Sequence, residues 1–268
     1  MMQAIFLLSL QNVNVAGLRI VNSQQVHMSI YSCQNVYISN VYLNSPGDSP
    51  NTDGIDLGQS QHIHIDHSAI EVGDDCIAMG NGIYDVNITR IVCGPGHGIS
   101  IGSLGKDGGE GKVDGVGIRH SQFYNTQNGA RIKTWQGGYG YVRNIHFQNL
   151  TFTNVKQPFI IDQYYCPGAT CRNQTNAVQI SDVLFAGSQG TSSSKLAIIL
   201  ACSESVACTN IVVKDIDLVL SGSKGKETTS YCLNAHGVAE GQVIPKVPCL
   251  QPASKNSFEI EKAIHHSK

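Results

Sequence analysis

The sequence is poor in charged residues, has a single tryptophan and contains no long apolar run. Asp, Glu, Lys and Arg make up 14% of the 268 residues, fewer than the charged surface of a helical bundle requires. The net charge of −2 gives no general attraction to nucleic acid or to an anionic membrane, so we expect neither as a partner. No stretch reaches the ~18 apolar residues of a membrane span. Glycine, with 28 residues, is abundant and favours a β-rich chain with many turns.

Apolar residues recur in a pattern that repeats eight times. They occupy offsets 0, 2, 5 and 7 of copies that begin at Val13, Val36, Ile63, Val86, Val116, Ile145, Val178 and Ile211. Two copies break the pattern with a serine, Ser68 or Ser121, at the third position. Alternation with period two is typical of strands, and no stretch shows a helical period. Short strands in a repeat of coil length predict an all-β fold, a parallel β-helix of about eight coils. A propeller would need longer units, and a sandwich would not explain the shared register.

We expect a single β-helix domain over residues 1–250 and a poorly ordered polar tail over 251–268, where the repeat is lost. Insertions rich in Gly, Ser or Pro separate some coils and are expected as loops that gather on one binding face, at 45–51, 104–113, 165–173 and 188–195.

Nine cysteines are many for a protein kept in a reducing compartment. No CxxC motif occurs and no Cys–His cluster repeats, which disfavours zinc. Proximity in the sequence favours four disulfides and leaves Cys33 as a free thiol; the pairs are Cys76 with Cys93, Cys166 with Cys171, Cys202 with Cys208, and Cys232 with Cys249. Sequons at Asn87, Asn149 and Asn173 agree with an extracellular protein. The apolar run from Ala4 to Leu10 has neither a preceding Lys or Arg nor a clear cleavage site, so no signal peptide is recognised.

Residues that can carry chemistry are concentrated between Asn51 and Lys133. Asp53, Asp75 and His97 are 22 residues apart in turn. Because stacked coils lie about 4.8 Å apart, we expect these three residues to form a ladder, with Asp74 beside it. Stacked carboxylates repel one another, and this raises the pKa of one of them. A carboxylic acid and a carboxylate can then coexist near neutral pH, as glycoside hydrolysis requires.

Two cations complete this set. Arg131 and Lys133 are two positions apart in a predicted strand, so they share a face and could hold a substrate carboxylate. Taken one at a time, each residue has a structural explanation: a solvated turn for the Asp pair, a packed imidazole for His97, an exposed strand face for the cations. Their coincidence in successive coils favours a functional site.

Four motifs, NTDGID, GDDC, GHGISIGS and RIKTW, resemble those of the polygalacturonases, the pectin-hydrolysing glycosidases, and especially the plant members. The resemblance runs from about Leu8 to Leu250 and includes NSQQVH and DQYYC. It implies a right-handed parallel β-helix and inverting hydrolysis of α-1,4-galacturonan without a metal or cofactor. It also implies residue roles: Asp74 as general acid, Asp53 and Asp75 as activators of water, His97 as a group that tunes the acid, and Arg131, Lys133 and Tyr164 as ligands of galacturonate.

The sequence departs from that family at its start. Family members begin with a secretion signal and with coils that cap the helix, whereas Met1 lies almost at a coil, so we expect a form that lacks the N-terminal cap. With that exception, we expect a secreted, monomeric cell-wall enzyme whose partner is polygalacturonate, the demethylated pectin backbone.

Two alternatives stay open. In a β-helix pectate lyase, Asp53, Asp74 and Asp75 would bind Ca²⁺, and Arg131 or Lys133 would abstract a proton. His97 and its GHGISIGS context argue against that assignment. A truncated chain could also bind pectin without hydrolysing it.

Overall fold

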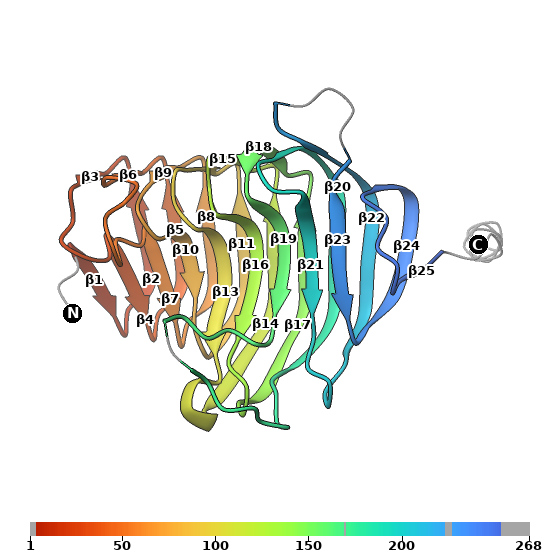
Figure 1. The fold of residues 1–268 in the computed structure, drawn as a ribbon. Coiled ribbons are helices and arrows are strands. Elements are labelled where there is room, and N and C mark those ends of the chain that lie inside the picture. Colours follow the sequence, from red (N-terminus) through yellow and green to blue (C-terminus); the bar gives the residue numbers. More distant parts are fainter. Residues whose placement is uncertain (1–3, 169, 223–226, 253–268) are drawn as a thin grey trace, which may run out of the picture.

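In the computed structural model, which describes residues 4–168, 170–222 and 227–252, short parallel strands stack into successive coils (Figure 1). The coils follow one another from the N-terminal end, in red, to the C-terminal end, in blue. This is the parallel β-helix that the repeat predicts. A 3-10 turn, η1 (Lys106–Gly108), lies in one of the predicted insertions. No helix in the described ranges is long and apolar enough to cross a membrane.

Two sheets form the walls of the coils. Within the described residues, nine strands form one sheet, here the nine-stranded sheet, in the order β1 (Ile5–Leu8), β4 (Met28–Tyr31), β7 (Ile55–Gly58), β10 (Asp75–Met79), β13 (Gly98–Leu104), β16 (Asn128–Thr134), β19 (Gln157–Asp162), β21 (Leu196–Ala201) and β23 (Thr229–Leu233). The other sheet, here the 16-stranded sheet, has two legs. One leg contains β2 (Gln11–Ala16), β5 (Gln34–Ser39), β8 (Gln61–Asp66), β11 (Ile83–Thr89), β14 (Glu110–Arg119) and β17 (Tyr139–Gln148). The second contains β3 (Arg19–Val21), β6 (Tyr42–Asn44), β9 (Ala69–Glu71), β12 (Val92–Cys93), β15 (Gln122–Tyr124) and β18 (Thr151–Val155).

The two legs form one sheet because one long strand pairs with the last strand of each. β20 (Gln179–Ser192) pairs with β17 over its first half and with β18 over its second. β22 (Cys208–Leu220), β24 (Ala235–Ile244) and β25 (Gln251–Pro252) then continue the sheet toward the C-terminal end.

Identical positions of successive coils stack on one another in the core. Ile55, Ile77 and Ile99 are paired in register across β7, β10 and β13, and each has an exposure of 0%. Burial of each such side chain is worth roughly 1.5–3 kcal/mol. The register read from the repeat is therefore confirmed in these coils.

The two serines that break the apolar pattern have a structural role. The backbone N–H of Val41 donates to Ser68 Oγ at 3.2 Å, and that of Ile91 donates to Ser121 Oγ at 3.1 Å. Each hydroxyl in turn donates to a backbone carbonyl two residues earlier in its own coil. Both serines are buried, and each hydroxyl both donates and accepts a hydrogen bond. Each serine therefore replaces an apolar contact with a hydrogen bond between adjacent coils.

Cysteines are paired as their proximity suggested. The disulfides are Cys76–Cys93, Cys166–Cys171, Cys202–Cys208 and Cys232–Cys249, and Cys33 is buried with a free thiol.

Three expectations from the sequence need correction. The insertion expected at 104–113 is strand at both ends, because β13 extends to Leu104 and β14 begins at Glu110. The insertion expected at 188–195 is largely strand, because Ser188 and Ser192 lie within β20. Their buried hydroxyls bond to Leu150 N–H and the Lys156 carbonyl, so a polar stretch forms regular structure. The tail expected from residue 251 starts in a strand, since β25 pairs with β24. Residues 253–268 of that tail lie outside the described residues.

Candidate active site

The charged residues of the four motifs meet on the outer face of the nine-stranded sheet. Register pairing places Asp56, Ala78, Ser100 and Arg131 in one row across β7, β10, β13 and β16. Because both neighbours of Asp56 in β7 are buried in the core, residues of this row point outward. The β-helix therefore brings side chains from four separate sequence segments onto one surface.

Asp75 is a buried carboxylate at the centre of the site and is surrounded by donors. Its Oδ1 accepts from Arg131 Nη2 at 2.6 Å and from Ser100 Oγ at 2.9 Å, and its Oδ2 accepts from Lys133 Nζ at 2.8 Å. Arg131 Nε also donates to Ser100 Oγ at 2.9 Å. Asp75 is 1% exposed, and both of its oxygens accept from cationic side chains, so its burial is accompanied by charge-assisted hydrogen bonds.

Asp74, next in the chain, has a different partner. Its Oδ1 lies 2.8 Å from His97 Nδ1 and accepts the backbone N–H of Asp75 at 2.8 Å. Burial acts to raise the pKa of Asp74, but the hydrogen bond and charge of His97, with the charge of Lys133, hold it below the ordinary value. The Asp74 side chain keeps 24% exposure, so it is accessible to solvent.

The predicted ladder is wrong at its third member. The register shifts between Asp75 and Ile77, so Asp75 lies opposite Gly98 and not opposite His97. Cys76, bonded to Cys93, is the additional residue at this irregularity. As a result, Asp75 turns outward although Ile77 points into the core, and His97 reaches Asp74.

Gly98 allows this close approach of coils. Its φ is 92°, and a Cβ there would lie 2.2 Å from the Asn128 carbonyl oxygen. Only glycine fits such a position without displacing backbone.

Two further carboxyls, Asp53 and Asp56, complete the cluster. Burial, together with the charges of Asp56, Asp74 and Asp75, raises the pKa of Asp53 to about 8, although Lys133 opposes the shift. Burial and the charges of Asp75 and Asp74 raise the pKa of Asp56 to about 7. The site thus combines Asp74, whose pKa is lowered, with Asp53 and Asp56, whose pKa values are raised by burial and by neighbouring carboxylates.

The sequence analysis missed Asp56. Its Oδ1 is buried and has no hydrogen-bond partner among the described residues. The alternation of the strand could have identified Asp56. Ile55 and Leu57 occupy inward positions, so the residue between them must point outward.

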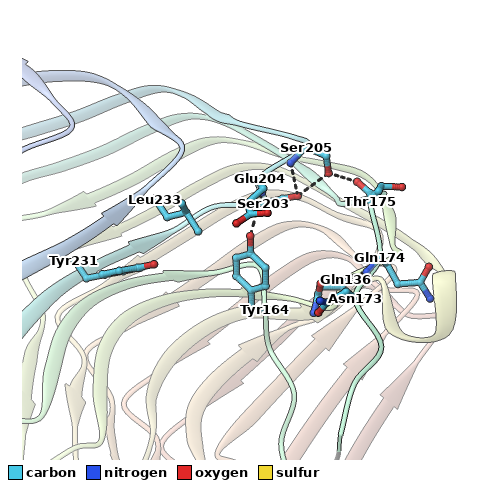
Figure 2. A pocket seen from close by; sticks show the side chains of 10 residues that line it. All are labelled: Gln136, Tyr164, Asn173, Gln174, Thr175, Ser203, Glu204, Ser205, Tyr231 and Leu233. Carbon is cyan, nitrogen blue, oxygen red and sulfur yellow. Dashed lines mark hydrogen bonds between the residues drawn. The ribbon is translucent and has the colours of Figure 1, made fainter.

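Tyr164 lies apart from the other predicted site residues, just after the end of β19. Its hydroxyl accepts the backbone N–H of Glu204 at 3.1 Å, and its ring lines a separate cavity with Tyr231 (Figure 2). Neighbouring Tyr165 provides a ring 5.2 Å from Lys133 Nζ. Arg131 and Lys133 therefore meet at Asp75, whereas Tyr164 belongs to the next part of the surface.

A calcium ion fits this cluster poorly. Ligand atoms of Asp74, Asp75 and His97 lie within 4.8 Å of one another, close enough to bind an ion in principle. However, both oxygens of Asp75 already accept from cationic side chains, Arg131 and Lys133. Calcium takes 6–8 oxygen ligands, and an ion here would lie against two positive groups. The donor set therefore disfavours the lyase alternative.

Known proteins show the same fold and share much of this sequence. Residues 2–243 match the model of "Glycosyl hydrolases family 28". A probable polygalacturonase of Arabidopsis thaliana is 46% identical over 241 residues, covering 90% of this chain and 54% of that protein. A polygalacturonase of Chamaecyparis obtusa is 42% identical, covering 94% of this chain and 49% of that protein. The solved structure of endo-xylogalacturonan hydrolase from Aspergillus tubingensis superposes with a TM-score of 0.75 at 27% identity, covering 90% of this chain and 68% of that one. The chain thus spans about half the length of the curated relatives it matches.

Proposed function

The chain belongs to glycosyl hydrolases family 28, and from that premise we propose that it is a polygalacturonase. Its substrate is the α-1,4-linked galacturonan of demethylated pectin, and it hydrolyses the linkage with inversion. The observation that carries the proposal is the crowding of four carboxyls around Arg131 and Lys133, with Asp74 accessible and bonded to His97. Such a set offers one group that gives a proton and others that accept one.

In the proposed reaction, Asp74 protonates the glycosidic oxygen as the leaving bond breaks. Water, activated by Asp53 and Asp75, attacks the anomeric carbon from the opposite face and gives its proton to the carboxylate of Asp53. Asp75 has both oxygens held by donors, so its contribution is to orient and polarise the water. After product release, solvent returns a proton to Asp74 and removes one from Asp53.

Substrate binding must redistribute protons in this scheme. In the empty site Asp53 holds a proton and Asp74 does not, the reverse of what the reaction needs. A galacturonate carboxylate near Lys133 and Arg131 takes up part of their positive charge, and the sugar excludes water from Asp74. Both effects raise the pKa of Asp74. Once Asp74 is protonated, its charge no longer raises the pKa of Asp53, so Asp53 releases its proton more easily. His97, bonded to Asp74, is the group through which the proton can be delivered.

Location and assembly are also proposals. Four disulfides support an extracellular protein, because such bonds persist in oxidising compartments. Pectin is a component of the plant cell wall, and plant polygalacturonases are among the relatives. We expect a monomer, since nothing in the proposed chemistry requires a second chain.

The first test is an assay of folded protein on polygalacturonate with and without EDTA, following reducing ends and the ultraviolet absorbance of unsaturated products. Hydrolysis gives reducing ends without absorbance and is indifferent to EDTA. Absorbance that EDTA abolishes identifies a calcium-dependent lyase and overturns the proposal. Polymer binding by folded protein without either signal identifies a chain that binds pectin only.

A further inference from the structure

A cavity is lined by residues of the coils that follow the carboxylate cluster, toward the C-terminal end of the nine-stranded sheet (Figure 2). Its volume is about 590 Å³, within the range of small-molecule sites. Tyr164 stands between Tyr231 on one side and Gln136 and Asn173 on the other, with Glu204 above its hydroxyl. The lining residues come from four successive coils, because Gln136 follows β16, Tyr164 follows β19, Glu204 follows β21 and Tyr231 lies in β23.

Disulfides and hydrogen bonds hold the loops of this cavity in place. Cys202–Cys208 closes the loop that carries Glu204, and Cys166–Cys171 closes the loop that leads to Asn173. Ser203 N–H donates to Gln163 Oε1 at 2.9 Å, and Asn234 Nδ2 donates to the Ser203 carbonyl at 2.6 Å. The cavity is thus largely formed before a ligand arrives, which lowers the entropic cost of binding.

The chemistry of its wall is the opposite of that at Asp75. Among the residues that line it, none is Lys, Arg or His, and the carboxylate of Glu204 has no ion-pair partner within the described ranges. The side-chain amides of Asn173 and Gln174 and the hydroxyl of Tyr231 likewise make no hydrogen bond inside the described part of the chain. Amides and hydroxyls bind uncharged oxygens, whereas an unpaired carboxylate repels an anion.

We infer that this cavity is a binding site for an uncharged sugar unit of the same polymer, namely a galacturonate methyl ester. The inference rests on the proposed function. The free carboxylate at the point of cleavage is held by Arg131 and Lys133, and a methyl-esterified unit farther along the chain occupies the cavity. The ester oxygens accept from the side-chain amide of Gln174, and the half-exposed ring of Tyr231 packs against the sugar. The enzyme thereby favours partly esterified pectin cut beside a free unit.

The test is a digest of partly methyl-esterified polygalacturonate, in which tandem mass spectrometry locates the methyl esters relative to each cut. The protein is produced without N-glycosylation, because Asn173 is a sequon residue in the cavity wall. We expect esters to be depleted at the unit beside the cut and enriched about tenfold at one fixed unit on one side of it. An ester distribution that is flat beyond the cleaved unit overturns the inference.

Glu204→Lys places a cation in the cavity. It should convert the enrichment of methyl esters at that unit into depletion, because the lysine then binds a galacturonate unit that keeps its free carboxylate. Gln174→Lys is a second variant with the same expected direction, should the first fail to fold. Gln122→Lys is the matched control, since Gln122 is exposed on β15 in the other sheet and should leave the ester map unchanged. Enrichment that survives in both cavity variants also overturns the inference. Absence of any cleavage on fully demethylated polymer counts against the proposed function instead, so the two failures are distinguishable.

Discussion

Two clusters of this molecule contain the same kinds of residue and differ in their charge balance. On the 16-stranded sheet, Asp66 accepts from Arg90 Nε at 3.1 Å and Nη2 at 3.0 Å, and it lies 2.8 Å from His67 Nδ1. Burial acts to raise the pKa of Asp66, but the hydrogen bonds and charges of Arg90 and His67 hold it below the ordinary value. At the carboxylate cluster, burial and the charges of neighbouring carboxylates raise the pKa values of Asp53 and Asp56, because carboxyls there outnumber cations.

Charged residues on a β-helix can stabilise the stack or carry chemistry, and the two kinds differ in how completely their charges are balanced. Ladders of polar residues are expected on the outside of stacked coils, and at Asp66 each partner neutralises the other. Asp114 follows the same rule, since it accepts from Arg143 at 2.7 Å and from Asn144 at 2.6 Å. A cluster in which carboxyls are not balanced by cations has shifted pKa values, so its groups can take up or release protons near neutral pH.

The largest effect is expected from Asp74→Asn. The amide cannot protonate the leaving oxygen, so kcat should fall by about 100- to 10,000-fold while binding of polygalacturonate is kept. Initial rates and polymer binding measured on the same preparation check this. Near-normal turnover would remove Asp74 from the role of acid.

A smaller loss is expected from Lys133→Ala. Lys133 is buried against Asp75, and losing its charged hydrogen bond to substrate should raise KM by about 10- to 100-fold with a lesser effect on kcat. Lys112→Ala is the matched control, because Lys112 pairs with Glu110 outside the cleft. An unchanged KM in Lys133→Ala contradicts its assignment as a substrate ligand.

The pH dependence should identify the raised carboxyl. If Asp53 activates water, kcat/KM reports its ionisation in the free enzyme and should rise with pH by about tenfold per unit, levelling near the raised pKa. Asp56→Asn removes a neighbouring charge, so the rising limb should move to lower pH. A limb that starts from an ordinary Asp pKa and does not respond to Asp56→Asn contradicts the crowding argument.

The same values predict opposite trends in stability. The folded chain binds the Asp53 proton more tightly than the unfolded chain does, so this carboxyl makes the free energy of unfolding fall as pH rises from about 4 to 8. Asp66, with its lowered pKa, contributes stability that is present above about pH 4 and is lost as pH falls through its folded value.

The smallest effect is expected from Asp66→Asn. It removes a partly exposed ion pair and should lower the free energy of unfolding by about 1 kcal/mol without changing kcat. Thermal melting and initial rates check both statements. A loss of turnover in this variant, without a loss of fold, would break the distinction between the two clusters.

The sequence alone predicted the fold, because the apolar register repeats from coil to coil and a parallel stack converts it into matched layers. It also identified the motif residues, since their types are unusual at positions where a repeat predicts apolar or neutral groups. The period alone placed His97 against Asp75, because the one-residue register shift at Cys76 cannot be read from a period; the action of His97 on Asp74 was implied only by the family resemblance. Nor did it find the cavity beside Tyr231, whose wall depends on loops shaped by two disulfides.

The stacking of coils also determines how this surface can change over generations. An extended ligand that follows the stack meets β10, β13, β16, β19, β21 and β23 in turn, so contacts with its successive units are encoded in successive coils. Each coil contributes its outward side chains while its inward ones maintain the core. A substitution at one outward position can therefore change the binding of one unit of the ligand and leave the contacts with the other units unchanged. A preference for a polymer with modified sugar units can therefore evolve by substitutions in one coil, while the residues at the site of cleavage stay the same.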